Sequence, residues 1–275
     1  MTRADADIDA LAGRILAAYD ARLQIPSICA ESPNFDLTQA YAVTAAVRRM
    51  RETRGEKPIG RKLGFTNSTI WDEYRVYAPI WGYLYNTTVT DISKTCQGVI
   101  DLTRVIEPRI EPEITLAFKR SPEPGMDERA ILECIDWVAH GFEVVQSLFP
   151  GWRFSAPDTV AAFGLHGALI LGPRHRIHDA NLDEWLAILE TFQIALHCGD
   201  DLVDRGVASN VLGGPLSALR YTIEVLASDP NNPQIAAGEI VTTGTVTRAF
   251  PISGGQTWYS EFPDAPFEAL TIETV

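Results

Sequence analysis

The sequence lacks the features that mark membrane-spanning, exported and nucleic-acid-binding proteins. No apolar run approaches the roughly 18 residues of a spanning helix, and the first ten residues, MTRADADIDA, do not follow the basic, apolar and small-residue order of a signal peptide. Basic residues are few: 23 lysines and arginines stand against 36 aspartates and glutamates, which gives a net charge of −13. We therefore expect neither nucleic acid nor a membrane as a partner, because both attract basic surfaces. An anionic substrate would need a local cation.

Cysteine is also scarce. No C-x-x-C pair occurs among the four cysteines, which are Cys29, Cys96, Cys134 and Cys198. This argues against zinc bound through cysteine and predicts reduced thiols in a cytoplasmic protein. Repeats and low-complexity tracts are absent too. What is present is a chain of 275 residues, 46% of them apolar and 21% charged, which is typical of a globular protein with a sizeable core.

The pattern of apolar residues changes along the chain. Residues 5–23 repeat apolar side chains at a helical period, and Asp36 opens a second helix with Gln39 at capping-box spacing. From Pro58 onward the sequence consists of short β-prone runs separated by glycine, proline and aspartate. We expect an α+β fold with a mostly antiparallel sheet core. It would form a single domain over residues 1–275, in which a helical N-terminal region, residues 1–57, packs on a β-rich core, residues 58–275.

The stretch RVIEPRIEPEITLAFKR, residues 104–120, places two carboxylates inside a strand-like apolar run. Side chains two residues apart on a strand share a face, so Glu111 and Glu113 would project side by side. Pro108 and Pro112 cannot donate ladder hydrogen bonds, which favours an edge strand or a bulged start. A functional pair of acids and the solvated face of a half-buried strand are both compatible with this pattern.

A third carboxylate, Glu143, lies in the β-prone run GFEVVQS after a helix predicted over residues 129–140. Three oxygen donors on rigid elements favour Mg²⁺ or Mn²⁺ over zinc. Lys62 lies between glycines in IGRKLGF and is either a general acid/base or an exposed strand lysine. Arg61 and Arg109 are further candidates for a substrate carboxylate, although each alone is also compatible with a surface position.

Five segments support a family resemblance. They are GRKLGFTN (60–67), EPEITLAF (111–118), HGFEVVQS (140–147), NVLGGPLSAL (210–219) and GEIVTTGTVT (238–247). In this order they resemble the fumarylacetoacetate hydrolase superfamily, and within it the branch of 2-keto-4-pentenoate hydratases and 4-oxalocrotonate decarboxylases. The resemblance runs from about Ile8 to the C-terminal strand.

The resemblance implies a fold, a cofactor and a site. The fold would be a β-roll or sandwich, like the C-terminal domain of fumarylacetoacetase, with N-terminal helices and one catalytic domain. Mg²⁺ or Mn²⁺ would bind at Glu111, Glu113 and Glu143, with Lys62 as the active-site lysine and a 2-oxo acid as substrate. The positions implied for substrate binding are Arg61, Leu63, Ile80, Phe163 and Thr245. A homo-oligomer is also implied, and it would cover the aromatic run from Trp71 to Tyr85.

Two segments depart from the hydratases that this chain resembles. Pro79-Ile80-Trp81-Gly82 stands where they have a Pro-Asp-Phe-Gly-like segment, so Ile80 replaces a carboxylate. The run from Ala162 to His166 stands where they have an Asp-Asn-x-Ser-Ser-like segment. Both changes favour a larger or more aromatic substrate than vinylpyruvate. His166 is either a replacement for a lost general base, and so catalytic, or a core histidine.

Our first functional hypothesis is a metal-dependent lyase, a hydratase of a 2-hydroxydienoate or 2-oxo-enoic acid from aromatic-compound catabolism. The second is a decarboxylase of a 2-oxo dioic acid such as 4-oxalocrotonate, and the third is an acylpyruvate-type hydrolase of a carbon–carbon bond. From a different class, the chain could be a scaffold that binds a 2-oxo acid without turnover. The metal and the lysine serve all three reactions, so they do not choose among them.

Overall fold

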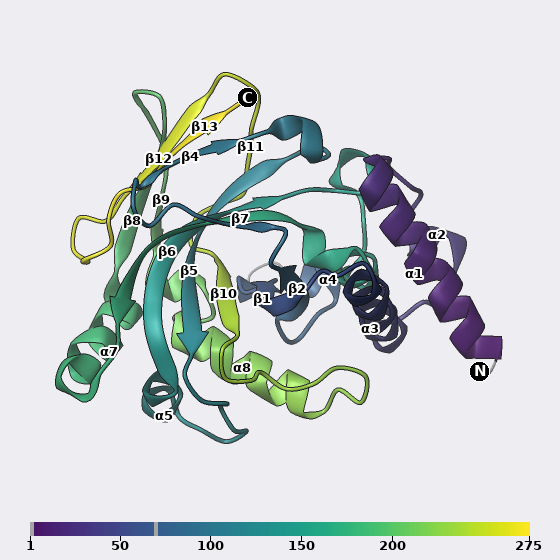
Figure 1. Ribbon diagram of the computed structural model, residues 1–275, viewed down its shortest axis with the longest axis horizontal. Helices are drawn as coiled ribbons and strands as arrows, with labels where there is room; N and C mark the ends of the chain where they lie inside the picture. The colour runs from purple at the N-terminus through teal and green to yellow at the C-terminus, as the bar shows by residue number, and fades with distance from the viewer. Residues whose placement is uncertain (1–2, 69–70) are drawn as a thin grey trace.

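Two curved sheets make up the centre of the molecule, with the N-terminal helices at one end and further helices beside the sheets (Figure 1). The structure is a computed structural model that describes residues 3–68 and 71–275. The larger sheet has the order β2-β1-β10-β5-β6-β7-β3, with β11 paired to β5, and the smaller has the order β4-β13-β12-β8-β9. Most pairings are antiparallel, while β1/β10, β3/β7 and β4/β13 are parallel. The predicted α+β class with a mostly antiparallel core is confirmed.

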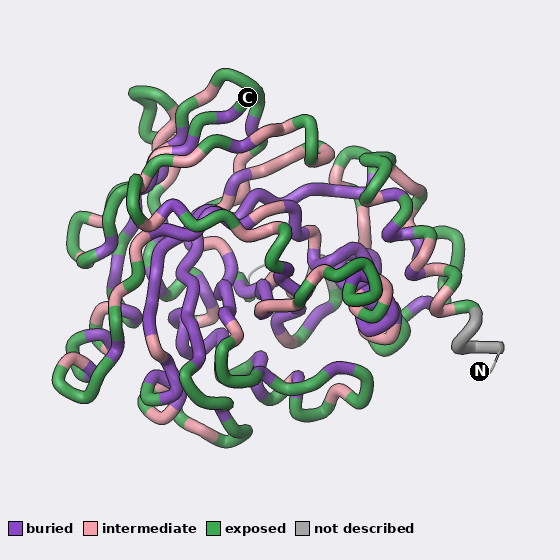
Figure 2. The backbone as a smooth tube through the Cα atoms, in the orientation of Figure 1, coloured by how far each residue is buried: buried purple, intermediate pink, exposed green. Residues whose placement is uncertain are grey.

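The strands are short except at the centre of the larger sheet. Their bounds are β1 (Pro58–Gly64), β2 (Ile80–Tyr85), β3 (Val89–Asp91), β4 (Gln97–Ile100), β5 (Arg109–Phe118), β6 (Ile135–Val145), β7 (His166–Arg176), β8 (Gln193–Cys198), β9 (Asp201–Val207), β10 (Ile240–Thr245), β11 (Phe250–Pro251), β12 (Thr257–Glu261) and β13 (Thr271–Thr274). Figure 2 shows that buried chain follows β5, β6, β7 and β10, whereas exposed chain follows the loops and the outer helix surfaces.

The helices lie around these sheets. Their bounds are α1 (Arg3–Ala21), α2 (Ile28–Glu31), α3 (Leu37–Thr53), α4 (Trp71–Tyr74), α5 (Glu128–Glu133), α6 (Ala156–Ala161), α7 (Leu182–Thr191) and α8 (Pro215–Ala227). Within residues 3–68 and 71–275, none of them combines the length and the apolar character needed to cross a bilayer.

The N-terminal helices form as the sequence predicts, and they reach the larger sheet. Asp36 caps α3 through a capping box, with its side chain accepting from the amide of Gln39 at 2.9 Å. Helix α3 packs against α1, α6 and β2. The apolar cluster between these helices also includes Ile80 and Phe163. The division into residues 1–57 and 58–275 as parts of one catalytic domain stays a prediction.

Strand β5 is not an edge strand, so that prediction was wrong. It pairs with β10 on one side and β6 on the other, near the middle of the larger sheet. Pro108 lies just before the strand begins, so it removes no ladder bond. Pro112 is tolerated because β10 shifts register between Thr242 and Thr245 beside it.

The helix predicted over residues 129–140 is also wrong in its second half. Helix α5 ends at Glu133, and residues 135–145 form β6, which contains His140. Strand β6 is buried on both faces, so its apolar residues do not alternate and their spacing also fits a helix. Helix α6 was missed, although Ser155 and Asp158 form a capping box at its start.

The close contact between the backbones of β1 and β10 can be tested by measuring the stability of glycine variants. A Cβ added at Gly60 would overlap the carbonyl oxygen of Ile240 in β10, whereas a Cβ at Gly13, in α1, would meet nothing within 4 Å. We expect Gly60→Ala to lower the free energy of unfolding by about 1–3 kcal/mol, because the backbones must separate. Gly13→Ala should raise it by about 0.5–1 kcal/mol through helix propensity. Urea unfolding measures both, and equal stability of Gly60→Ala and the parent would contradict the packing described.

Candidate active site

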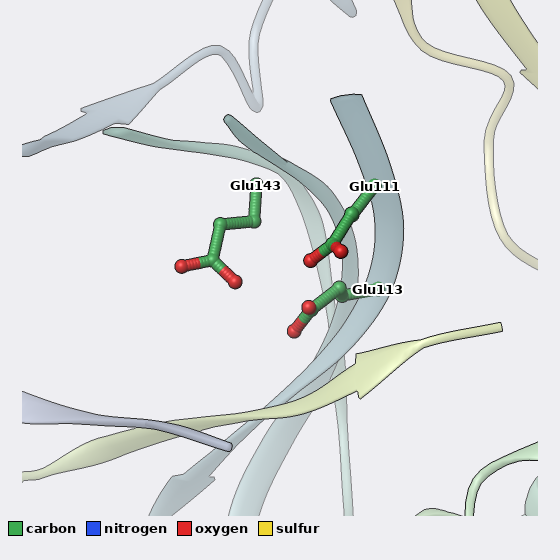
Figure 3. Close-up of side chains that lie close together, drawn as sticks. All are labelled: Glu111, Glu113 and Glu143. Carbon is green, nitrogen blue, oxygen red and sulfur yellow. The ribbon is translucent and has the colours of Figure 1, made fainter. Parts of the chain in front are cut away.

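Three glutamate side chains converge on one space between the central strands (Figure 3). Glu111 and Glu113 lie on the same face of β5, as their spacing predicts, and Glu143 is the direct cross-strand partner of Glu111 in β6. One carboxylate oxygen from each residue lies within 4.8 Å of the others. Glu113 and Glu143 are buried, while Glu111 is partly open to a cavity. A solvated strand face is therefore excluded.

Burial dominates the electrostatics of this cluster. It raises the pKa of Glu111 to about 8; nearby Lys62 opposes this shift and Glu113 adds to it. Burial and the adjacent Glu143 raise the pKa of Glu113 well above its usual range, and burial raises the pKa of Glu143 as well. Without a further cation, the pKa of each of these three carboxyl groups therefore lies above that of an ordinary carboxyl group.

The environment of the carboxylates suits a hard cation. All three side chains offer oxygen, which is the donor that Mg²⁺, Mn²⁺ and Ca²⁺ prefer. The Oε2 atom of Glu113 accepts a hydrogen bond from the amide of Gly244 at 3.0 Å, whereas its buried Oε1 atom has no hydrogen-bond partner within residues 3–68 and 71–275. Such an atom is costly to bury, and a metal ion would satisfy it. The residues present therefore fit a divalent metal.

Lys62 is the cation next to the cluster. Strand β1 buries its side chain, and Nζ lies 3.0 Å from Glu143 Oε2. The ammonium also donates to the carbonyl oxygen of Gly164 at 3.0 Å. Burial alone would lower the pKa of Lys62, but Glu143, Glu111 and Glu113 outweigh it and raise that pKa above its usual value. An exposed strand lysine is excluded.

The carbonyl of Gly164 reaches Lys62 because the chain turns sharply after α6. Phe163, Gly164 and Leu165 all have positive φ, between 61° and 65°. This turn lies against Gly82 in β2, where an added Cβ would overlap the carbonyl of Phe163. Phe163 and Leu165 are not glycines, so a positive φ strains their backbone. The surrounding packing must offset this strain.

A cavity of about 680 Å³ opens beside Lys62 and Glu111. Apolar side chains form much of its wall; they are Leu63, Ile80, Val145, Trp152, Phe154 and Leu165. Arginines line it as well. They are Arg109, Arg205 and Arg248. The guanidinium of Arg109 lies 4.1 Å from the centre of a ring of Trp152, and Arg248 is paired with Asp204. The cavity therefore offers local cations to an anion in a chain of net negative charge.

The predicted substrate-binding residues divide into two groups. Leu63, Ile80 and Thr245 line the cavity, and the Thr245 hydroxyl donates to the carbonyl of Thr247 at 3.0 Å. Arg61 and Phe163 do not line it.

Arg61 points to the opposite face of β1 from Lys62. There it pairs with Glu239 and lies over the ring of Tyr83. Phe163 packs against Tyr19 and faces the N-terminal helices. The structure therefore separates these two residues from the cavity that holds the other candidates.

His166 touches the glutamate cluster but not the cavity. Its Nδ1 atom lies 2.8 Å from Glu143 Oε1, and its Nε2 atom lies 2.9 Å from Thr88 Oγ1. The ring is buried and does not appear among the cavity-lining residues. Burial, together with the charge of Lys62, lowers the pKa of His166 well below its usual range. A neutral imidazole therefore holds a carboxylate oxygen.

Sequence reasoning missed several residues of the site. The missed residues are Thr88, Trp152, Arg205 and Arg248, whose closeness to β5 arises only in the folded chain. No local pattern marks the first three. Arg248 alone had a signal, because it directly follows the segment 238–247 that carried the family resemblance.

Comparisons with known proteins agree with this geometry, although no family model matches the chain. The 4-oxalocrotonate decarboxylase of Pseudomonas sp. strain CF600 is 30% identical over 232 residues, which cover 84% of this chain and 83% of that protein. The 2-hydroxyhexa-2,4-dienoate hydratase of Comamonas testosteroni is 26% identical over 243 residues, 88% of each chain. The structure of 4-oxalocrotonate decarboxylase from Pseudomonas putida G7 with magnesium and adipate aligns with a TM-score of 0.89, at 26% identity, over 100% of this chain and 99% of that one. The chain thus belongs to the family of 4-oxalocrotonate decarboxylases and dienoate hydratases, and it shares the fold of fumarylacetoacetate hydrolase family proteins.

Proposed function

We propose that this chain is a divalent-metal-dependent lyase that acts on a 2-hydroxydienoate or 2-oxo-enoic acid of aromatic-compound catabolism. One observation carries the proposal: three clustered glutamates and a buried lysine lie beside a cavity with arginines in its wall. The names of the relatives, which are decarboxylases and hydratases of such acids, support it.

Glu111, Glu113 and Glu143 would hold the metal, which we propose to be Mg²⁺ or Mn²⁺. When bound, a divalent cation supplies Lewis-acid stabilisation of the negative charge that develops on a 2-oxo acid. The protein's own contribution is to bury the ligands and to align them on two paired strands. Such alignment reduces the reorganisation that the site needs during the reaction.

Lys62 is the proposed proton-transfer group. It lines the cavity, and in the absence of metal the carboxylates hold it in its protonated form. A cation bound to the same glutamates would weaken that hold, which brings the ammonium closer to a useful acid. General acid catalysis of this kind contributes about 10²- to 10⁴-fold. In hydration, our first hypothesis, Lys62 would move a proton on the substrate while water adds at its distal carbon.

Decarboxylation is the second candidate, and the cavity wall favours it specifically. Arg109, Arg205 and Arg248 could pair with the second carboxylate of a 2-oxo dioic acid. Loss of CO₂ leaves its electron pair on the conjugated 2-oxo group and needs no base in that step. The side chains of Ile80 and Leu165 offer no base to this part of the cavity. After CO₂ has left, Lys62 could donate a proton to a carbon of the substrate. Hydrolysis of a carbon–carbon bond and binding of a 2-oxo acid without turnover are lesser candidates, because no feature of the cavity favours either.

A homo-oligomer stays part of the proposal, on resemblance alone. The aromatic run that suggested it is largely covered within the chain, because Trp81, Tyr83 and Tyr85 are buried. Among the aromatic residues of the run whose burial the structure describes, Tyr77 is 77% exposed and Trp71 is half-buried. Sedimentation of the purified protein would establish its oligomeric order.

Turnover with and without metal tests the function directly. We expect the protein to consume 2-hydroxypenta-2,4-dienoate, 4-oxalocrotonate or both in the presence of Mg²⁺ and to lose this activity after treatment with a chelator. Release of CO₂ from 4-oxalocrotonate identifies a decarboxylase, and formation of a 4-hydroxy-2-oxo acid identifies a hydratase. If no 2-oxo acid is turned over, the chain is a binding scaffold and the proposed lyase is wrong.

Removal of one ligand tests the metal assignment without reference to turnover. We expect Glu113→Gln to abolish measurable Mn²⁺ binding in calorimetry, because the amide retains the size of the side chain but loses its charge. Glu133→Gln is the control, since Glu133 lies on the surface beside Arg120. Equal Mn²⁺ affinity in the two variants would exclude Glu113 as a ligand.

Metal affinity should also depend on pH with a definite sign. Because burial raises the pKa of Glu111 to about 8 in the metal-free protein, protons compete with the metal below that pH. Affinity should therefore rise as pH increases from about 6 to about 8, by up to about tenfold per pH unit for one displaced proton, and then level off. Calorimetry in buffers of different ionisation enthalpy reports the proton release. A pH-independent affinity with no proton release would contradict the proposed ligand set.

A further inference from the structure

Three side chains form a polar row behind the glutamate cluster, in which Thr88 is half-buried and His166 and Glu143 are buried. Thr88 lies in the turn between β2 and β3, His166 begins β7, and Glu143 lies in β6. The imidazole joins the other two, with Nε2 2.9 Å from Thr88 Oγ1 and Nδ1 2.8 Å from Glu143 Oε1. The row brings together residues that are 78 and 23 positions apart in the sequence.

The proton positions in this row follow from the chemistry of its ends. An ionised carboxylate only accepts, so the proton between His166 and Glu143 belongs to Nδ1. In a neutral ring, Nε2 then carries the lone pair and must accept from the hydroxyl of Thr88.

The Thr88 hydroxyl has one proton and two acceptors within reach. It accepts from the amide of Tyr85 at 3.3 Å, and it can donate either to the carbonyl of Tyr85 at 3.1 Å or to Nε2 of His166 at 2.9 Å. With the Nδ1 proton given to an ionised Glu143, Nε2 is the acceptor to which the hydroxyl donates. A hydroxyl that donates to Nε2 selects the tautomer of His166 that can donate to Glu143.

The two oxygens of Glu143 have different surroundings. Oε1 lies 2.8 Å from Nδ1 of His166, while the buried Oε2 lies 3.0 Å from Nζ of Lys62. A free carboxylate rotates about its terminal bond, and rotation here would break the contact with the imidazole. His166 therefore restricts which oxygen of Glu143 faces the other two glutamates.

We propose that His166 is a positioning residue that fixes the Glu143 carboxylate as a metal ligand, with Thr88 fixing the imidazole tautomer. This inference rests on the proposed metal role of the three glutamates. It replaces the hypothesis that His166 is a catalytic base, because the ring is buried behind Glu143 and does not line the cavity. Partners that orient metal ligands typically affect metal affinity or activity by about 10- to 100-fold.

Two substitutions at His166 separate the hydrogen bond from the bulk of the ring. His166→Phe keeps an aromatic ring but removes the donor, so Mn²⁺ affinity should fall by about 10- to 100-fold. His166→Asn places an amide nitrogen near the position of Nδ1, and it should recover most of that loss. Calorimetry without substrate measures both. If the phenylalanine variant binds Mn²⁺ as tightly as the parent, or the asparagine variant binds as weakly as the phenylalanine variant, the proposal is wrong.

Two further measurements keep the test valid if a His166 variant fails to fold. Thr88→Val should weaken Mn²⁺ binding, whereas Thr87→Val, whose hydroxyl contacts Glu56 on the surface, should not. In the unaltered metal-free protein, ¹⁵N NMR should find the His166 ring protonated at Nδ1. A ring protonated at Nε2 alone, or equal Mn²⁺ affinity in the two threonine variants, would overturn the proposal.

The outcomes also separate this inference from the proposed function. If the unaltered chain binds no divalent metal, the metal-dependent lyase fails and the role of Glu143 as a ligand fails with it. If it binds metal but turns over no 2-oxo acid, the lyase fails, while the affinities of the variants still decide the role of His166.

Discussion

The burial of three carboxylates around one space is the constraint on which the rest of this structure depends. When all are ionised, Glu111, Glu113 and Glu143 carry three negative charges, and Lys62 is the cation paired within the cluster. Two negative charges remain uncompensated in a poorly solvated place, where like charges repel strongly. In the metal-free chain, burial and this repulsion disfavour the ionised form and raise the pKa of the glutamates. A divalent cation is the species whose charge would remove it.

Main-chain geometry holds the cluster together from several sides. The amide of Gly244, a glycine with φ of 94°, donates to Glu113, and the carbonyl of Gly164 accepts from Lys62. Both groups belong to irregular backbone, one at the register shift of β10 and one in the turn after α6. Such backbone is less adaptable than a side chain, because neighbouring strands and helices determine its position. The positions of the site's side chains are thus determined mainly by the larger sheet and by the turn that follows α6.

The glutamate cluster and the wall of the neighbouring cavity have separate roles in the proposed chemistry. The carboxylates and Lys62 suit any reaction in which charge develops on a 2-oxo acid, whatever bond changes next. The wall contains Ile80 and Leu165, which cannot position water, and Arg205, which suits a second anion. Hydration and decarboxylation differ in these needs, so the wall and not the carboxylates should determine the outcome. That division also explains how relatives with two activities can share one fold.

The sequence by itself determined the local features of this protein. The two-residue spacing of Glu111 and Glu113 placed them on one face, and the capping box at Asp36 began a helix, because both depend on neighbours within a few residues. Tertiary structure decided what such periodicity cannot express. It made β5 a central strand despite Pro112, extended β6 through His140, turned Arg61 away from the cavity, and joined Thr88 to His166. Each of these depends on which distant strand or turn lies alongside, and a local sequence pattern does not encode that pairing.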